Sequence, residues 1–336
     1  MKAKKMDRSV KLYSVLKSFE KLNLSLTPTP LNKLETISRQ LCSNIYCKRD
    51  DLTGFAFGGN KTRKLDYLIK DAIMAGADSI VTFGSNQSNW CRMTASAGAV
   101  NGLEVYLILA GRTPEKPTAN LLLDHLSGAF ITHIDTEDEV VLINSAMRKA
   151  AEITKAGKKP YYIAVGGSNA IGSLGYIRAF AEILEHSEKT GIEFSKIIVA
   201  SGSAGTQAGM VAGKVMSGWD GSVIGMAVSR NSNEQEENVC KIAVETLELT
   251  GVNYSISELK DAVIVDDNYL GEGYRRNTDE CLEAIEMFAR MEGIFLDEVY
   301  TGKAAAGLVG YARSGKIKAD ENILFVHTGG SVQLFE

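Results

Sequence analysis

Short apolar runs alternate with helix-length amphipathic segments along most of this chain. In the first half the apolar runs are SIVTFG, EVYLILAG, FITHI and PYYIAVGG, and segments with helical spacing lie near residues 87–100, 119–126 and 140–155. Strands of near-continuous apolar character that alternate with helices are typical of βαβ units, in which helices cover both faces of a parallel sheet. The pattern therefore predicts an α/β fold with buried, mostly parallel sheets.

The second half repeats this style, from KIIVASGSAGTQAG through SVIGMAVS to NILFVHTGG. Further helices are expected across NEQEENVCKIAVETLELTG and near residues 278–291. At 336 residues the chain exceeds the usual size of a single core, so we expect two domains or one two-lobed unit.

Charge and residue usage exclude several classes of protein. The net charge of −4 and the pI near 5.8 give no basic field that would attract nucleic acid. No stretch approaches the roughly 18 consecutive apolar residues of a membrane span. The N-terminus lacks the apolar core of a secretory signal, so we expect a cytoplasmic protein.

Five cysteines without CxxC spacing are expected to be reduced thiols, and four isolated histidines predict no metal site.

Four glycine-rich loops follow apolar runs: FGSNQSN, VGGSN, SGSAGTQAG and HTGG. Ligands bind beyond the carboxyl ends of strands in open parallel sheets, so these loops predict one shared crevice. Ser201 to Gly209 lie where a strand should give way to a helix, and free amides there can cradle a phosphate. The loop is neither GxGxxG nor a Walker loop, and a tight turn without a ligand is the alternative interpretation.

The stretch GGNKTRKL, residues 58–65, places an approachable lysine next to two glycines. Lys61 can form a Schiff base with an aldehyde if its surroundings lower the pKa of the ammonium group. Partial burial and the nearby cations Arg63 and Lys64 are expected to do so. Together with a phosphate cradle, this lysine predicts pyridoxal phosphate as cofactor; the alternative is a solvated basic helix start.

Six motifs in order resemble one family across nearly the whole chain: KRDDLTGFAFGGNKTRKLDYL, GSNQSN, GGSNAIGSLGY, SGSAGTQAG, DEVYTGKAAAGL and HTGG. They resemble the fold-type II pyridoxal-phosphate enzymes of the D-cysteine desulfhydrase and 1-aminocyclopropane-1-carboxylate deaminase group. The resemblance implies two open, twisted α/β lobes like those of tryptophan synthase β, with pyridoxal phosphate between them. It implies a large lobe from 1–64 and 166–336, a small inserted lobe from 65–165, and a homodimer.

The resemblance also implies site residues. Lys61 matches the lysine that carries the cofactor and then acts as base at the substrate carbon. The other residues matched to the cofactor are Asn60, Lys64, Ser203, Ala204, Gly205, Thr206, Thr301 and Thr328. Gln87, Ser88 and Asn89 match the loop that grips the carboxylate of a small amino-acid substrate, and Tyr274 and Tyr300 match a pair that faces it. The candidate catalytic residues are thus Lys61, Ser88, Tyr274 and Tyr300.

Two threonines favour one reaction within the family. Cyclopropane-cleaving members carry glutamate and leucine where this chain has Thr301 and Thr328. A threonine has no charge to keep the pyridine nitrogen protonated, so the ring is a weaker electron sink, suited to expelling a good β leaving group. We therefore expect D-cysteine to be converted to pyruvate, sulfide and ammonia.

The sequence is also compatible with other functions. Within the family the rivals are deamination of 1-aminocyclopropane-1-carboxylate and release of sulfite from cysteate. Trp90 stands where the family usually has histidine or glutamine, and Arg275 and Arg276 follow Tyr274 where glycine is common. The arginines could bind an anionic substrate side chain or simply face solvent. A non-catalytic sensor is disfavoured by Lys61, and a dehydrogenase by the missing GxGxxG motif.

Overall fold

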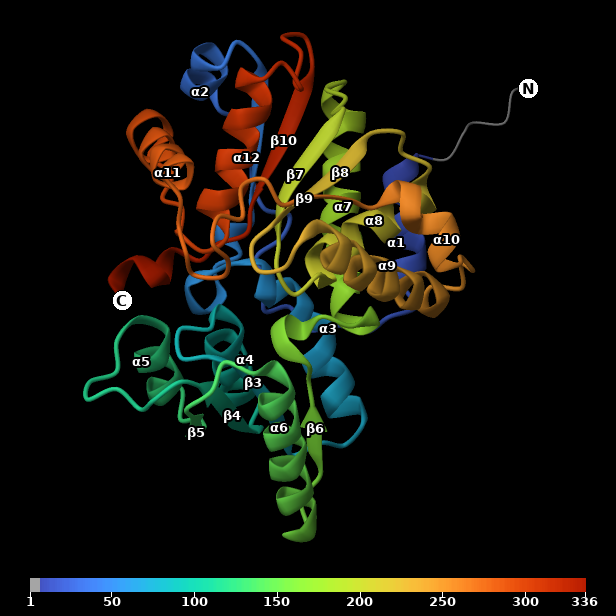
Figure 1. Cartoon of the computed structure of the whole chain (residues 1–336). Helices are drawn as coiled ribbons and strands as arrows, with labels where there is room; N and C mark the ends of the chain where they lie inside the picture. The colour runs from blue at the N-terminus through green and yellow to red at the C-terminus, as the bar shows by residue number, and fades with distance from the viewer. Residues whose placement is uncertain (1–6) are drawn as a thin grey trace.

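The computed structural model describes residues 7–336, which form two α/β lobes (Figure 1). The larger lobe, at the top of Figure 1, contains a six-stranded sheet in the order β1-β2-β10-β7-β8-β9, in which only the β1–β2 pair is antiparallel. Its strands are β1 (Leu31–Lys33), β2 (Asn44–Arg49), β7 (Lys196–Ser201), β8 (Ser222–Ala227), β9 (Ile264–Asp266) and β10 (Asn322–His327).

Helices cover both faces of this sheet. Along β7, Ile197 and Val199 pack against one group of helices, whereas Ile198 and Ala200 pack against the other. Successive strand residues point to opposite faces, and both faces are buried, which explains the continuous apolar run in the sequence. The first group is α1 (Arg8–Leu16), α7 (Ala170–Thr190), α8 (Gly205–Ser217), α9 (Ser232–Leu249) and the short α10 (Ile256–Leu259). The second is α2 (Glu35–Gln40), α11 (Asp279–Glu292) and α12 (Thr301–Arg313).

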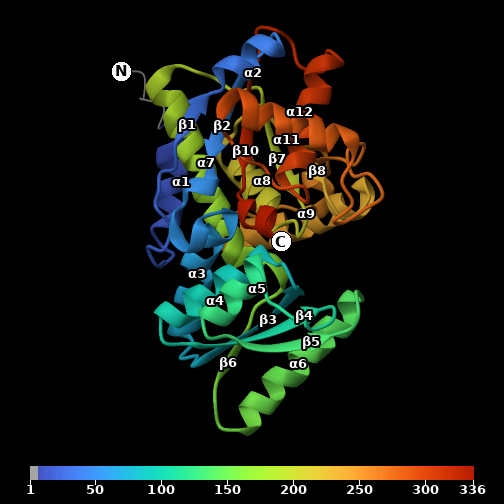
Figure 2. The same ribbon diagram turned by 90° about the vertical axis from the view of Figure 1, so that its left-hand side faces the viewer.

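The smaller lobe contains a four-stranded parallel sheet in the order β5-β4-β3-β6. Its strands are β3 (Ser79–Ser85), β4 (Glu104–Ala110), β5 (Phe130–Ile134) and β6 (Pro160–Tyr162). Its helices are α4 (Asn89–Val100), α5 (Ala119–Leu126) and α6 (Glu139–Lys155), and α3 (Asn60–Met74) contacts both α4 and the large-lobe helix α7. Figure 2 shows α3 at the junction of the lobes. The start of α3 is therefore placed by packing from both lobes.

The predicted α/β class with mostly parallel sheets is confirmed. The expected helices at 119–126 and 140–155 match α5 and α6 to within one residue. The run PYYIAVGG gives only a short strand, because β6 ends at Tyr162 and the 3-10 turn Val165–Gly167 follows, with Gly166 at a φ of +68°. The residue limits expected for the two lobes stay a prediction.

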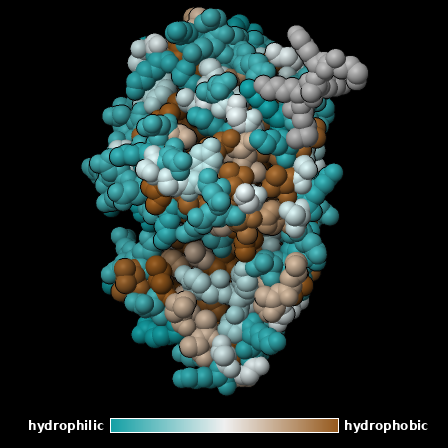
Figure 3. Space-filling model, turned by 90° about the vertical axis from the view of Figure 1, so that its right-hand side faces the viewer, coloured by the Kyte–Doolittle hydropathy of each residue, from teal (hydrophilic) through white to brown (hydrophobic). Residues whose placement is uncertain are grey.

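The face of the molecule shown in Figure 3 is mostly hydrophilic, with hydrophobic residues visible near the level where the lobes meet. None of the helices within residues 7–336 is both long and apolar enough to cross a membrane. All five cysteines are free, and only Cys42 is exposed. No group of three potential metal ligands occurs in the described part of the chain.

Candidate active site

A cavity of about 960 Å³ is lined by residues of both lobes. Its wall contains parts of all four glycine-rich loops, at residues 83–90, 165–166, 200–207 and 328–330. Three of these loops follow the carboxyl ends of β3, β7 and β10, as expected for ligand sites of open parallel sheets. The prediction of one shared crevice is confirmed.

Lys61 lies in the first turn of α3 and lines this cavity. Its Nζ forms no hydrogen bond or ion pair with any residue from 7 to 336 that the structure describes. Burial lowers the pKa of Lys61 to about 8, so an appreciable fraction of the amine is neutral near neutral pH. The expected contribution of Arg63 is wrong, because its guanidinium group is paired with Asp50 and Glu182. The amine has the position and protonation needed to attack an aldehyde.

The turn before α3 has room only for glycine. Gly58 has a φ of +69°, and a Cβ there would lie 1.9 Å from the carbonyl oxygen of Asp51. The next amide, that of Gly59, donates to the Thr53 hydroxyl at 2.8 Å and to the Asp50 carbonyl oxygen at 3.1 Å. These bonds fix the backbone that leads into Lys61, which explains the two glycines of GGNKTRKL.

The loop between β7 and α8 fits a phosphate group. Ser203, Ala204 and Thr206 line the cavity at the N-terminus of α8, where helix amides and the helix dipole favour an anion. The Asn60 side chain donates to the Thr206 hydroxyl at 3.0 Å, which ties this loop to the turn that carries Lys61. Because an approachable lysine and an anion-binding helix start share one cavity, the residues present fit pyridoxal phosphate.

Ser168, which the sequence reasoning did not single out, supports this loop from behind. Its hydroxyl donates to Ser203 Oγ at 2.8 Å and accepts from the amide of Gly205 at 3.3 Å. Lys64 Nζ donates to the Gly166 carbonyl oxygen at 3.0 Å and to Ser168 Oγ at 3.3 Å. Lys64 and Gly205 are thus in a layer behind the cavity wall and do not line it. The sequence signals for Ser168 were the loop VGGSN and the motif GGSNAIGSLGY, both of which contain it.

The loop between β3 and α4 presents a second helix N-terminus to the cavity. Ser88 is the N-cap of α4, accepting from the amide of Cys91 at 3.2 Å, and Ser88 and Asn89 line the cavity. Gln87 does not: its side chain accepts from the Asn120 amide at 2.9 Å and is directed at the start of α5. The expectation that the Gln87 side chain faces the substrate is therefore not supported by its position.

Tyr274 and Tyr300 lie together in the cavity wall, with their hydroxyl oxygens 2.6 Å apart. Burial, aided by the Tyr274 hydroxyl, raises the pKa of Tyr300 well above its usual value. Tyr300 therefore keeps its proton throughout the physiological range and can donate a hydrogen bond. The pairing of these tyrosines matches the expectation from the resemblance.

The two threonines lie in different places. Thr328 is buried in the cavity wall, and its carbonyl oxygen accepts from the amide of Asn60 at 2.9 Å. Thr301 does not line the cavity, since its hydroxyl donates to Asp297 Oδ1 at 2.6 Å. The expected contact of Thr301 with the cofactor ring therefore has no support from its hydrogen bonding.

Charged side chains surround the more exposed part of the cavity. Arg230 of the large lobe pairs with Glu139 at the start of α6 at 2.7 Å and so joins the two lobes. No sequence motif pointed to this contact. Arg275 pairs with Glu336 and, like Arg276, is exposed while also lining the cavity. The two interpretations of these arginines, substrate contact and solvent exposure, are both compatible with this placement.

Trp90 is mainly a core residue. Only 2% of its surface is exposed, and its indole nitrogen donates to the Thr82 hydroxyl at 2.8 Å. A Cβ at Gly167 would lie 2.7 Å from the Trp90 ring, so the tryptophan fills space against the VGGSN loop. Its departure from the family pattern thus has a packing explanation.

Comparisons with known proteins agree with this geometry. Residues 22–329 match the family described as "Pyridoxal-phosphate dependent enzyme". A protein of Pyrococcus furiosus named "Putative 1-aminocyclopropane-1-carboxylate deaminase" is 40% identical over 320 residues, covering 95% of this chain and 94% of that protein. A relative with the same name from Pyrococcus horikoshii is also 40% identical.

Solved structures give the same result. A crystal structure described as an "ACC deaminase homologue" is 38% identical, with a TM-score of 0.88 over 97% of this chain and 96% of that chain. Threonine deaminase isoform 2 of Solanum lycopersicum, 17% identical, shares the fold with a TM-score of 0.68 over 98% of this chain and 85% of its own. The chain therefore belongs to the fold-type II family of pyridoxal-phosphate-dependent enzymes.

Proposed function

We propose that this enzyme eliminates the β-substituent of D-cysteine, which with one water molecule gives pyruvate, hydrogen sulfide and ammonia. When bound, pyridoxal phosphate supplies an electron sink that makes the substrate α-proton acidic. The hydrogen on the α-carbon leaves as a proton, and the bond between the β-carbon and sulfur then breaks. The choice of D-cysteine follows the motif resemblance described above.

Residues of this chain have separate tasks in this proposal. Lys61 would hold the cofactor, and its free amine would take the α-proton at Nζ. Ser88 and the first amides of α4 bind the substrate carboxylate, as a helix N-terminus does for an anion. The hydroxyl pair of Tyr274 and Tyr300 provides a proton donor for the departing sulfur. Burial of Lys61 keeps its amine partly neutral near pH 8, which suits a base.

One observation favours elimination over ring opening: the buried part of the described cavity wall contains hydroxyl and amide groups but no carboxylate. The acidic residues in that wall are exposed or half-buried, namely Glu137, Glu139, Glu272 and Glu336. Without a buried carboxylate to stabilise a protonated pyridine nitrogen, the ring is a weaker electron sink. Such a site can expel a good leaving group such as sulfide but is less suited to opening an unactivated cyclopropane ring.

Deamination of 1-aminocyclopropane-1-carboxylate is the second candidate, because the relatives with 40% identity carry that name. Elimination of sulfite from cysteate is a third, supported by Arg276, which lines the cavity and has no ion-pair partner among residues 7–336. An arginine of this kind can bind a sulfonate through paired N–H donors.

The test is a substrate panel with four separate product assays. D-cysteine, L-cysteine, cysteate and 1-aminocyclopropane-1-carboxylate are each given to the purified enzyme while sulfide, sulfite, pyruvate and 2-oxobutyrate are measured. We expect sulfide and pyruvate in equal amounts from D-cysteine. Production of 2-oxobutyrate from the cyclopropane substrate, without turnover of D-cysteine, would replace this proposal with the deaminase.

A further inference from the structure

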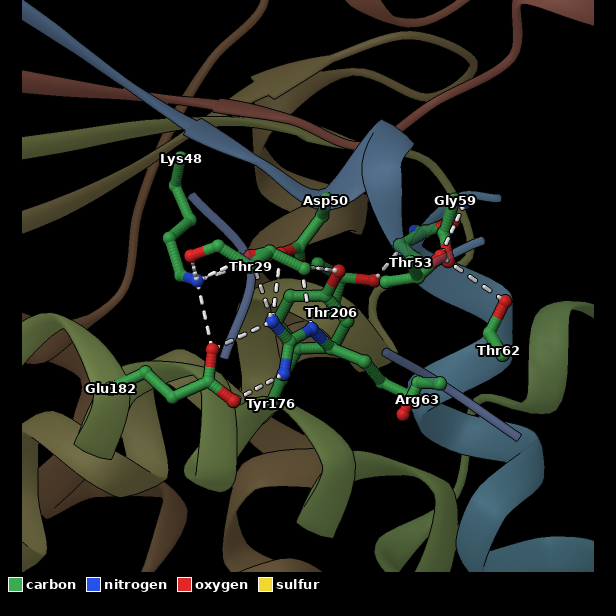
Figure 4. Close-up of polar contacts among 12 residues, drawn as sticks. Thr29, Lys48, Asp50, Thr53, Gly59, Thr62, Arg63, Tyr176, Glu182 and Thr206 are labelled. Atoms are coloured by element: carbon green, nitrogen blue, oxygen red, sulfur yellow. Dashed lines mark hydrogen bonds and ion pairs between the residues drawn. The ribbon is translucent and has the colours of Figure 1, made fainter. Parts of the chain in front are cut away.

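Behind the first turn of α3 lies a cluster of four buried charges, Lys48, Asp50, Arg63 and Glu182 (Figure 4). Their side chains are at most 4% exposed, and their formal charges cancel. Burial alone would raise the pKa of Asp50, but Arg63 and Lys48 outweigh it and lower that pKa to about 2. The carboxylate is therefore ionised at any physiological pH.

Arg63 is the centre of this cluster. Its Nε and Nη2 donate to the two oxygens of Asp50, both at 2.9 Å, and its Nη1 and Nη2 donate to the two oxygens of Glu182, both at 2.8 Å. Figure 4 shows the planar guanidinium group held between the two carboxylates. Two bidentate contacts fix both the position and the plane of an arginine.

The cluster links two elements, β2 and α7, to the turn that carries Lys61. Asp50 follows β2, Glu182 lies in the middle of α7, and the Tyr176 hydroxyl, also on α7, donates to Asp50 Oδ2 at 2.7 Å. Arg63 comes two residues after Lys61, so about 200° of helix rotation separates the two side chains. Lys61 consequently faces the cavity while Arg63 faces the cluster.

A buried ion cluster needs a reason other than stability. Removing four charges from water is costly, and well-packed apolar side chains of similar volume are often as stabilising or more so. What apolar side chains lack is directional bonding. Because the Arg63 guanidinium group is bonded to both Asp50 and Glu182, it prevents α3 from rotating about its axis or sliding along α7. Either motion would displace Lys61 Nζ.

We propose that Arg63, held by Asp50 and Glu182, is a positioning residue that aims Lys61 at the cofactor aldehyde and at the substrate carbon. The proposal rests on the function assigned to Lys61 above. It assigns no chemical step to the cluster. Displacement of a reacting group by about 1 Å can cost on the order of 100-fold in rate, so a small loss of alignment is measurable.

The decisive variant is Arg63→Lys, which keeps the charge but loses the planar double contact. The full-length enzyme is measured with pyridoxal phosphate for kcat, KM, thermal unfolding and the visible absorbance band of the bound cofactor. We expect kcat to fall at least about tenfold. KM should change less than about threefold, because Ser88 and Asn89, which are proposed to bind the substrate carboxylate, do not touch the cluster. The fraction of enzyme showing the band at limiting cofactor should also fall.

Arg313→Lys is the matched control. Arg313 makes the same bidentate contact with Glu283, but that pair is about half exposed and neither residue lines the cavity. We expect kcat and the absorbance band of this variant to equal those of the unaltered enzyme. If Arg63→Lys and Arg313→Lys behave alike in both measurements, the positioning role is overturned, even if Arg63→Lys lowers the unfolding temperature.

A milder variant covers the case in which Arg63→Lys does not fold. Tyr176→Phe removes a single hydrogen bond to Asp50 and keeps the ring in the core. A fall of about threefold or more in kcat, below the unfolding transition, supports the proposal; unchanged kcat and an unchanged band contradict it. Lys61→Ala separately tests whether Lys61 carries the cofactor. If that variant keeps the absorbance band, the function assigned to Lys61 is wrong, regardless of the result for Arg63→Lys.

Discussion

Asp124 on α5 gives a quantitative test of how this structure responds to pH. Its side chain is fully buried, and neither carboxylate oxygen has a hydrogen-bond partner among the described residues. Burial raises the pKa of Asp124 to about 8, against a smaller opposing effect of Arg92. The folded protein therefore holds a proton there at neutral pH that the unfolded chain has lost.

The sign and size of the effect follow from linkage. The pKa of Asp124 is higher in the folded than in the unfolded state. The contribution of Asp124 to the free energy of unfolding is therefore greatest below pH 4 and declines as pH rises toward 8. The slope is about 1.4 kcal/mol per pH unit where the two states differ by one proton. Between pH 5 and pH 7 Asp124 should therefore reduce the free energy of unfolding by up to about 3 kcal/mol.

The perturbation is Asp124→Asn, which keeps the shape and removes the titration. The free energy of unfolding is measured by urea titration at pH 5 and pH 7 for both proteins. From pH 5 to pH 7, the free energy of unfolding of the variant should rise relative to that of the unaltered protein by up to about 3 kcal/mol. Asp220→Asn, at a side chain that is 98% exposed, is the control. A difference for Asp124→Asn that does not change with pH would refute the reasoning.

Three further predictions concern the site and the assembly. Gly205→Ala should weaken pyridoxal-phosphate binding by about 1–3 kcal/mol, because the added Cβ would lie 2.8 Å from the Ser168 backbone. An unchanged dissociation constant in a fluorescence titration would contradict the claim that the loop between β7 and α8 binds the phosphate. Tyr274→Phe should lower kcat by on the order of 100-fold with little change in KM, by loss of the hydroxyl next to Tyr300, and steady-state kinetics that show normal kcat would exclude a proton-transfer role for that hydroxyl. The homodimer implied by the family resemblance predicts twice 36.3 kDa in size-exclusion chromatography with light scattering, whereas 36.3 kDa would show a monomer.

The elements of this fold were predictable because their signals are local. Amphipathic spacing marks α6 and continuous apolar runs mark β3, β4 and β7, and none of these signals depends on distant residues. The short β6 was overestimated, since the apolar residues after Tyr162 look like more strand, whereas Gly166 and Gly167 adopt positive φ and turn the chain. Glycine conformation depends on the fold around it and cannot be read from an apolar run.

The site was predictable as a set of loops but less so as a set of side-chain contacts. Lys61, Ser88 and the two tyrosines line the cavity as expected. Lys64 does not, because its amine is bound by groups 102 and 104 residues further along the chain. Thr301 was likewise placed by motif position, whereas its hydroxyl is taken by Asp297. A motif gives a residue's place in the chain, but contacts distant in sequence decide where the side chain points.

The central claim is that Lys61 carries the cofactor. The direct measurement is to load the enzyme with pyridoxal phosphate, reduce it with borohydride to make the linkage permanent, and locate the modified lysine by peptide mass spectrometry. We predict modification of the peptide containing Lys61 at close to one group per chain, with Lys64 in the same peptide unmodified in the fragment spectrum. Modification at Lys64 or at surface lysines instead, or no modification of this peptide, would contradict the account.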